Sequence, residues 1–85
     1  MKEFSYTITD PEGMHARPAG LLVKKANEYN CSVTLKSGEK TADAKRIFAV
    51  MGLGIKQGQQ VSFQLEGEEE DKAAKELEVF MKENL

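Results

Sequence analysis

The hydrophobic spacing switches repeatedly between the period of a strand and that of a helix, and the order of these switches constrains the fold more than any other feature. Apolar and polar residues alternate, as in strands with one buried face, in 4–9, 32–36 and 61–66. Apolar residues recur at helical spacing in 19–29, 45–53 and 73–81. A turn at 37–39 allows a short strand near 40–42, paired as a hairpin. The predicted order of elements is βαββαβα.

Four strands with one apolar face each need a cover, and three amphipathic helices can supply it on one side. We therefore expect an α+β fold. The 85 residues contain no internal repeat, linker or low-complexity segment, so one domain spanning 1–85 is predicted. A chain this short can hardly build the deep cleft of a small-molecule enzyme, which favours a module that larger proteins bind.

The composition argues against several function classes. Twelve basic residues against fourteen acidic ones do not provide the basic excess that is usual in nucleic-acid-binding domains. No apolar run approaches the ~20 residues of a membrane span, and no N-terminal segment has the pattern of a signal peptide. Cys31, the single cysteine, cannot form an intramolecular disulfide. We therefore expect a cytoplasmic protein in which this thiol is a small buried hydrophobe or an unreactive surface group.

His15, the only histidine, lies between Gly13 and the start of the first apolar helical segment. A helix N-terminus has unpaired N–H groups and the positive end of the helix dipole, so it would hold a phosphate carried on a side chain there. Near pH 7 an imidazole can be a neutral nucleophile. Arg17 offers a planar donor fork for phosphate oxygens, and Pro18 fits the first helical turn while biasing Arg17 away from helical dihedral angles. Together these residues predict a phosphohistidine site.

Other chemistries fit these residues less well. Zinc needs three or four ligands, which one histidine and one distant cysteine do not supply, so no metal is expected. Asp10, Glu12 and Asp43 could each orient the imidazole, yet their spacing identifies no base–orienter pair. The segment 52–54 lacks the rest of a dinucleotide or phosphate-loop fingerprint and is interpreted as a loop. A capping or packing role for His15 is the remaining alternative.

Two segments are the most informative: Gly13-Met14-His15-Ala16-Arg17-Pro18-Ala19 and Ala44-Lys45-Arg46-Ile47-Phe48-Ala49-Val50-Met51-Gly52-Leu53-Gly54. With them the chain resembles, over essentially all 85 residues, the HPr family, the histidine-containing phosphocarriers of the phosphoenolpyruvate-dependent sugar phosphotransferase system. The resemblance implies an open-faced β-sandwich, with a four-stranded antiparallel sheet covered on one face by three helices. It also implies that His15 Nδ1 accepts phosphate from phosphorylated enzyme I and passes it to enzyme IIA domains. Arg17 would balance charge, and the amides of Ala16 and Arg17 would hold phosphate oxygens.

The resemblance further implies a phosphocarrier rather than a stand-alone catalyst, without metal or cofactor, and we expect a monomer. Brief docking suits a small interface of apolar side chains ringed by basic ones. The residues that could form it are Lys24, Lys45, Arg46, Ile47, Phe48 and Met51. Ile47 and Met51 could instead belong to the core, whereas Phe48 is expected to be exposed.

Arg46 departs from the family pattern. Many HPr proteins have a serine here, which an HPr kinase phosphorylates in Gram-positive relatives to regulate catabolite repression. Arginine cannot accept that phosphate and is a poor helix N-cap, so Asp43 could cap an earlier helix start, or the helix end frays. The alternative function is an HPr-like regulatory module whose phosphorylation state is recognised by partner proteins. A structural domain with an incidental histidine would leave the motif around His15 unexplained.

Overall fold

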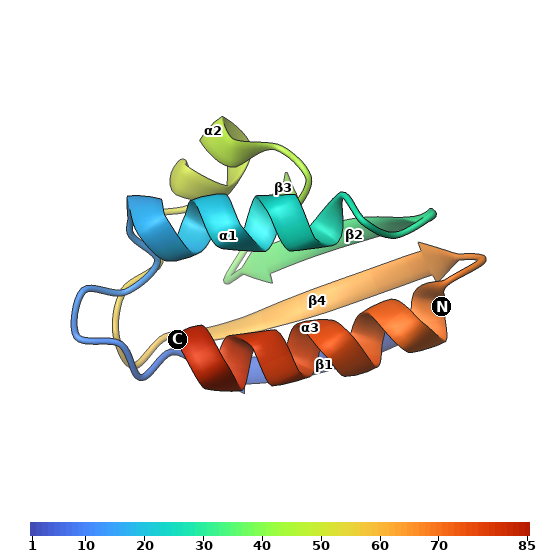
Figure 1. Ribbon diagram of the computed structural model, residues 1–85. Coiled ribbons are helices and arrows are strands. Elements are labelled where there is room, and N and C mark those ends of the chain that lie inside the picture. Colours follow the sequence, from blue (N-terminus) through green and yellow to red (C-terminus); the bar gives the residue numbers. More distant parts are fainter.

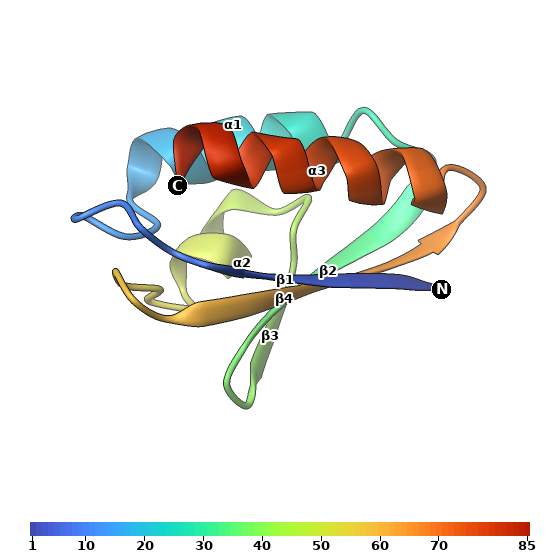
Figure 2. The same cartoon turned by 90° about the horizontal axis from the view of Figure 1, so that it is seen from below.

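The computed structural model describes residues 1–85 and contains a four-stranded antiparallel sheet with three helices. The elements are β1 (Lys2–Thr7), α1 (Ala16–Ala26), β2 (Cys31–Ser37), β3 (Lys40–Asp43), α2 (Ile47–Met51), β4 (Gln60–Gly67) and α3 (Glu70–Asn84). Helices α1 and α3 lie side by side over one face of the sheet and run in opposite directions, while α2 lies next to α1 and β3 (Figures 1 and 2). The predicted open-faced sandwich and the order βαββαβα are confirmed.

Strands β4 and β2 are the two inner strands of the sheet, because the strand order is β1-β4-β2-β3. In β4, Phe63 lies opposite both Phe4 of β1 and Leu35 of β2. The rings of Phe4 and Phe63 stack with their centroids 4.7 Å apart. Phe63 is fully buried, so it links the sheet to the core beneath the helices.

The core follows the predicted periodicities. The buried strand residues are Val33, Leu35, Ala42, Val61, Phe63 and Leu65. Facing them are Pro18, Ala19, Leu22 and Ala26 of α1, and Ala73, Leu77 and Met81 of α3. Cys31 is also buried, and this burial raises the pKa of its thiol. The interpretation of Cys31 as a small buried hydrophobe is confirmed.

Helix α1 begins three residues before the apolar spacing that predicted it, at Ala16. Ala16 and Arg17 are exposed, so hydrophobic periodicity could not mark them. The expectation that Pro18 keeps Arg17 out of helical geometry is wrong, because Arg17 belongs to the first helical turn. The N–H of Ala19 donates to the carbonyl of His15 at 3.0 Å. That bond closes the turn and requires the residues between them to be helical.

The same helix also ends earlier than predicted, at Ala26 rather than near Tyr29. The side chain of Asn27 donates to the carbonyl of Val23 at 2.9 Å and so satisfies one of the last helical carbonyls. Tyr29 is buried beyond the helix, and its hydroxyl donates to Glu76 of α3. Burial and this bond raise the pKa of Tyr29 to about 12. The tyrosine therefore connects the two long helices instead of extending α1.

Helix α2 is a short helix ended by Gly52, as predicted, but it covers only Ile47–Met51. Asp43 does not cap an earlier start of this helix. Its Oδ1 accepts the N–H of Lys45 at 2.9 Å, within the preceding turn. Arg46 is the N-cap and makes no side-chain capping bond, in accord with the poor capping ability of arginine. None of the helices combines the length and the apolar character that crossing a membrane requires.

Candidate functional site

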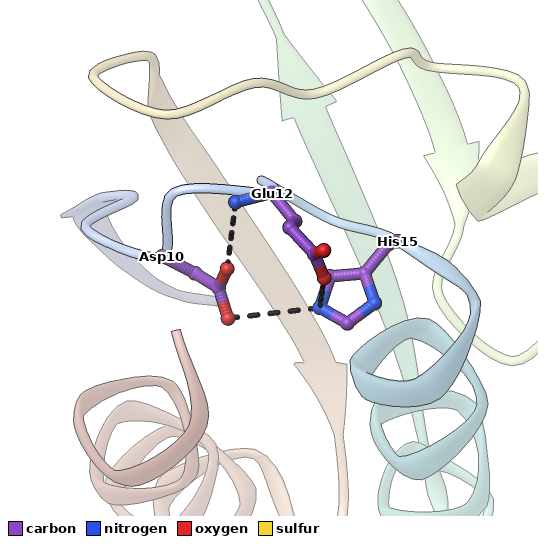
Figure 3. A group of neighbouring side chains, drawn as sticks. All are labelled: Asp10, Glu12 and His15. Atoms are coloured by element: carbon purple, nitrogen blue, oxygen red, sulfur yellow. Dashed lines mark hydrogen bonds and ion pairs between the residues drawn. The ribbon is translucent and has the colours of Figure 1, made fainter.

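The loop between β1 and α1 holds His15 in a defined place (Figure 3). The loop makes a turn at 10–13, in which the carbonyl of Asp10 accepts the N–H of Gly13 at 2.9 Å. Gly13 has a φ of 67°, and a Cβ at this position would lie 2.5 Å from the carbonyl oxygen of Ile55. The N–H of Met14 donates to that same oxygen at 3.0 Å. Glycine is therefore required here, because the loop lies directly against the segment that follows α2.

His15 is the N-cap residue of α1, with an extended backbone and no side-chain capping bond. The amides that follow it are those predicted to hold phosphate oxygens. No backbone carbonyl accepts a hydrogen bond from the N–H of Ala16 or Arg17, and Pro18 has no N–H. Two free donors therefore lie directly after the histidine, at the positive end of the helix dipole.

The first turn of α1 carries no acidic residue, whereas the first turn of α3 has Glu70 and Asp71. Carboxylates at a helix start usually compensate the positive end of the dipole. Arg17 is exposed, and its guanidinium takes part in none of the ion pairs of the structure. An anion at this end of α1 would meet two free amides, and the guanidinium of Arg17, which forms no ion pair, belongs to the same helical turn.

The imidazole of His15 lies between solvent and two carboxylates (Figure 3). Its Nε2 is 3.6 Å from Oδ2 of Asp10 and 3.4 Å from Oε2 of Glu12. Nδ1 lies on the other side of the ring, away from both carboxylates. The side chain is 35% exposed, so another protein can reach it. Of the three acids considered from the sequence, Asp43 does not face the ring, since it bonds the amide of Lys45.

Asp10, Glu12 and His15 are also the residues that could hold a cation, because one ligand atom of each lies within 4.8 Å of the others. From the sequence, His15 and Cys31 alone suggest no metal site, and none is expected. The sequence does not show that the turn brings the carboxylates of Asp10 and Glu12 back to the ring. Three such ligands are the minimum of a zinc site.

The residues predicted to form the docking surface differ in their exposure and in whether they bond to the rest of the fold. Phe48 is 88% exposed and Met51 38% exposed, while Ile47 is partly buried against the core. Lys24 and Arg46 are exposed. The ammonium of Lys45 donates to the carbonyl of Tyr29 at 2.8 Å, so this cation is partly used to hold the fold.

Leu21 was not singled out in the sequence. It is 45% exposed on α1, the helix that packs against α2. Leu21 lies outside the buried stripe of α1, so the helical spacing could have identified it as an exposed apolar residue.

A family model described as the PTS HPr component phosphorylation site matches residues 2–83. The chain belongs to the HPr family. Phosphocarrier protein HPr of Lysinibacillus sphaericus is 43% identical over 83 residues, which cover 98% of this chain and 94% of that protein. The crystal structure of HPr-C-His from Thermoanaerobacter tengcongensis has a TM-score of 0.94 and 34% identity, and it covers 99% of this chain and 94% of that one. The resemblance noted in the sequence is thus confirmed as family membership.

A further HPr-like structure concerns oligomeric state. The Bacillus subtilis catabolite repression containing protein Crh, described as a domain-swapped dimer, has a TM-score of 0.78 and 30% identity, and it covers 100% of this chain and 98% of that one. The expected monomer therefore stays a prediction. As an HPr, the chain is a phosphocarrier of the phosphotransferase system.

Proposed function

We propose that His15 of this HPr accepts a phosphoryl group from phosphorylated enzyme I and passes it to enzyme IIA domains during sugar uptake. One observation carries the proposal: a reachable imidazole directly precedes two amides, of Ala16 and Arg17, that have no backbone acceptor. A phosphoryl group on that ring would lie next to donors that are already in place. Membership in a family of phosphocarriers supports the same assignment.

Phosphoryl transfer needs few further groups from the protein. Transfer between two imidazoles needs the donor and acceptor nitrogens nearly in line, and the charge on the three equatorial oxygens must be neutralised. The amides of Ala16 and Arg17 and the Arg17 guanidinium would supply this neutralisation. Because His15 lies at an exposed helix end, a second protein can reach the phosphoryl group from outside.

The test uses the wild-type chain, enzyme I, magnesium and phosphoenolpyruvate. We expect one acid-labile phosphate, located on His15 by tandem mass spectrometry and assigned to Nδ1 by ³¹P and ¹⁵N NMR. Adding an enzyme IIA domain should then remove the label from this chain and place it on the domain. Phosphate on another residue, or no phosphate at all, would refute the proposal.

We propose that enzyme I and enzyme IIA domains dock on a surface formed by Lys24, Lys45, Arg46, Ile47, Phe48 and Met51. Phe48 is its principal apolar contact because 88% of it is exposed. Phe48→Ala should raise the KM of enzyme I for this HPr by about tenfold, the cost of losing a central interface aromatic. Val79→Ala is the control, since Val79 is also exposed but lies on α3. Equal effects of the two substitutions would show that Phe48 is not a specific contact.

We propose that Arg46 removes one form of regulation from this HPr, the phosphorylation of this position by an HPr kinase. It is exposed at the N-cap of α2 and has no hydroxyl to phosphorylate. An ATP-dependent HPr kinase should therefore label an Arg46→Ser variant and leave the wild type unlabelled. Modification of the wild type at another residue would end this part of the proposal.

A regulatory module is the second candidate function, and the likeness to Crh, which is named for catabolite repression, favours it. In that case partner proteins would recognise the phosphorylation state of His15 without taking the phosphate. Labelling by enzyme I without onward transfer to any enzyme IIA domain would support this candidate over the carrier.

A further inference from the structure

We propose that Asp10 is a positioning residue for His15: it holds the neutral imidazole in the tautomer with the proton on Nε2 and thereby leaves the Nδ1 lone pair free to attack phosphorus. The inference rests on the proposed function of His15. It adds a residue that acts through the ring and does not touch the phosphoryl group.

Asp10 is held in place at several atoms. Its Oδ1 accepts the N–H of Glu12 at 2.8 Å, its carbonyl accepts the N–H of Gly13 at 2.9 Å, and its own N–H donates to the backbone oxygen of Leu85 at 2.9 Å. The second carboxylate oxygen, Oδ2, is left facing Nε2 of His15 at 3.6 Å. Only 25% of the Asp10 side chain is exposed, so its orientation is defined by the loop.

Glu12 is less suited to this role although its Oε2 is slightly closer to Nε2, at 3.4 Å. Its side chain is 74% exposed and is free to turn into solvent. A long exposed carboxylate contributes little to holding a fixed geometry. We therefore assign the positioning role to Asp10 and only an auxiliary effect to Glu12.

The tautomer follows from charge, because the two carboxylates act on the ring through their negative charge and form no hydrogen bond with it. A neutral imidazole has one N–H donor and one acceptor nitrogen, whereas an ionised carboxylate only accepts. The nitrogen that faces carboxylates, Nε2, is therefore the one that carries the proton. Nδ1, which faces away from them, keeps its lone pair.

This arrangement balances the transfer without moving a proton on His15. The Nδ1 lone pair forms the new N–P bond, while the bond from phosphorus to the donor imidazole breaks and its electrons remain with the donor. The His15 ring keeps its Nε2 proton and gains a positive charge, which the Asp10 carboxylate stabilises, as a carboxylate does for other catalytic imidazoles. When the phosphoryl group leaves, the N–P electron pair returns to Nδ1.

Asp10→Asn tests the inference because the amide places a donor where an acceptor now lies. The remaining oxygen would keep the bond from the Glu12 amide, so the NH₂ group would take the place of Oδ2 beside Nε2. A donor there favours the tautomer protonated on Nδ1, which has no lone pair for phosphorus. Ring ¹⁵N shifts at a pH where the imidazole is neutral should show loss of the Nε2–H tautomer. The rate of phosphoryl uptake should fall by at least about tenfold, since an amide in place of the carboxylate that orients a catalytic imidazole can lower the rate by as much as about 10⁴-fold.

Asp43→Asn is the matched control. Asp43 also uses Oδ1 to accept the N–H of the residue two positions on, Lys45, at 2.9 Å, but it faces no imidazole. Asp43→Asn removes the same charge from the same kind of turn. It should leave the His15 tautomer and the saturated rate of phosphoryl uptake at wild-type values. Glu12→Gln should have a smaller effect than Asp10→Asn.

The inference is overturned if the wild-type ring is not mainly Nε2–H, or if Asp10→Asn changes neither the tautomer nor the uptake rate. A changed tautomer with wild-type uptake would also overturn it, because the tautomer would then not matter for transfer. If wild-type His15 accepts no phosphate, the proposed function fails. The ¹⁵N spectra of the unphosphorylated protein still decide separately whether Asp10 positions the ring.

Discussion

His15→Ala is expected to reduce acid-labile labelling of the chain to background, a fall of at least about 10³-fold in the rate of phosphoryl uptake from enzyme I. The substitution removes the nucleophilic nitrogen, and there is no second histidine to replace it. The amides at the start of α1 and the Arg17 guanidinium would remain, but neutralising phosphate oxygens does not form a covalent bond. Labelling with phosphoenolpyruvate, enzyme I and magnesium measures the effect directly.

The same substitution should leave the fold intact, which separates lost chemistry from lost structure. The imidazole is 35% exposed and makes no capping hydrogen bond, so the free energy of unfolding should change by less than about 1 kcal/mol. Circular dichroism and urea titration provide this control. Substantial labelling of a folded His15→Ala variant would mean that another residue is the phosphoacceptor.

Phe63→Ala is expected to have the largest effect on stability, a loss of about 3–5 kcal/mol in the free energy of unfolding. Phe63 is fully buried in the inner strand β4 and stacks on Phe4, so truncation removes apolar contacts and leaves a cavity between sheet and helices. Domains of this kind are stable by roughly 5–15 kcal/mol, so the loss is a large fraction of the total. Urea unfolding monitored by circular dichroism measures it.

Phe48→Ala is the matched control, since it makes the same chemical change at a side chain that is 88% exposed. It should alter the free energy of unfolding by no more than about 0.5 kcal/mol. The two phenylalanines are thus expected to separate stability from docking. Comparable destabilisation by both variants would contradict this division.

The parts of the fold that sequence predicts well depend on periodicity. The alternation of Phe4, Tyr6 and Ile8 and the spacing of Leu22 and Ala26 marked the sides of the elements that face the core. Ile8, Leu22 and Ala26 are buried, and Phe4 and Tyr6 are partly buried against the core. Element ends were less predictable where exposed residues form the terminus, since hydrophobic spacing carries no signal there. Ala16 and Arg17, the first two residues of α1, are exposed.

The candidate site also has residues that the sequence identifies and contacts that it does not. His15 and Arg17 could be singled out because residue type and neighbours already suggested phosphate chemistry. The pairing of His15 with Asp10 depends on the turn made by Gly13, and Lys45 donates to the distant carbonyl of Tyr29. Such contacts follow from packing between segments, which local sequence does not encode.

The hydrogen bond from the Met14 amide to the Ile55 carbonyl joins the loop that carries His15 to the segment just after α2. Both groups are backbone atoms, so the attachment tolerates changes of side chain except at Gly13, where a Cβ would lie 2.5 Å from the Ile55 carbonyl oxygen. A partner that docked on α2, as we propose, would therefore meet the histidine at a fixed position relative to its contact surface. Exposed side chains of α2 could accordingly be replaced without altering where the imidazole lies.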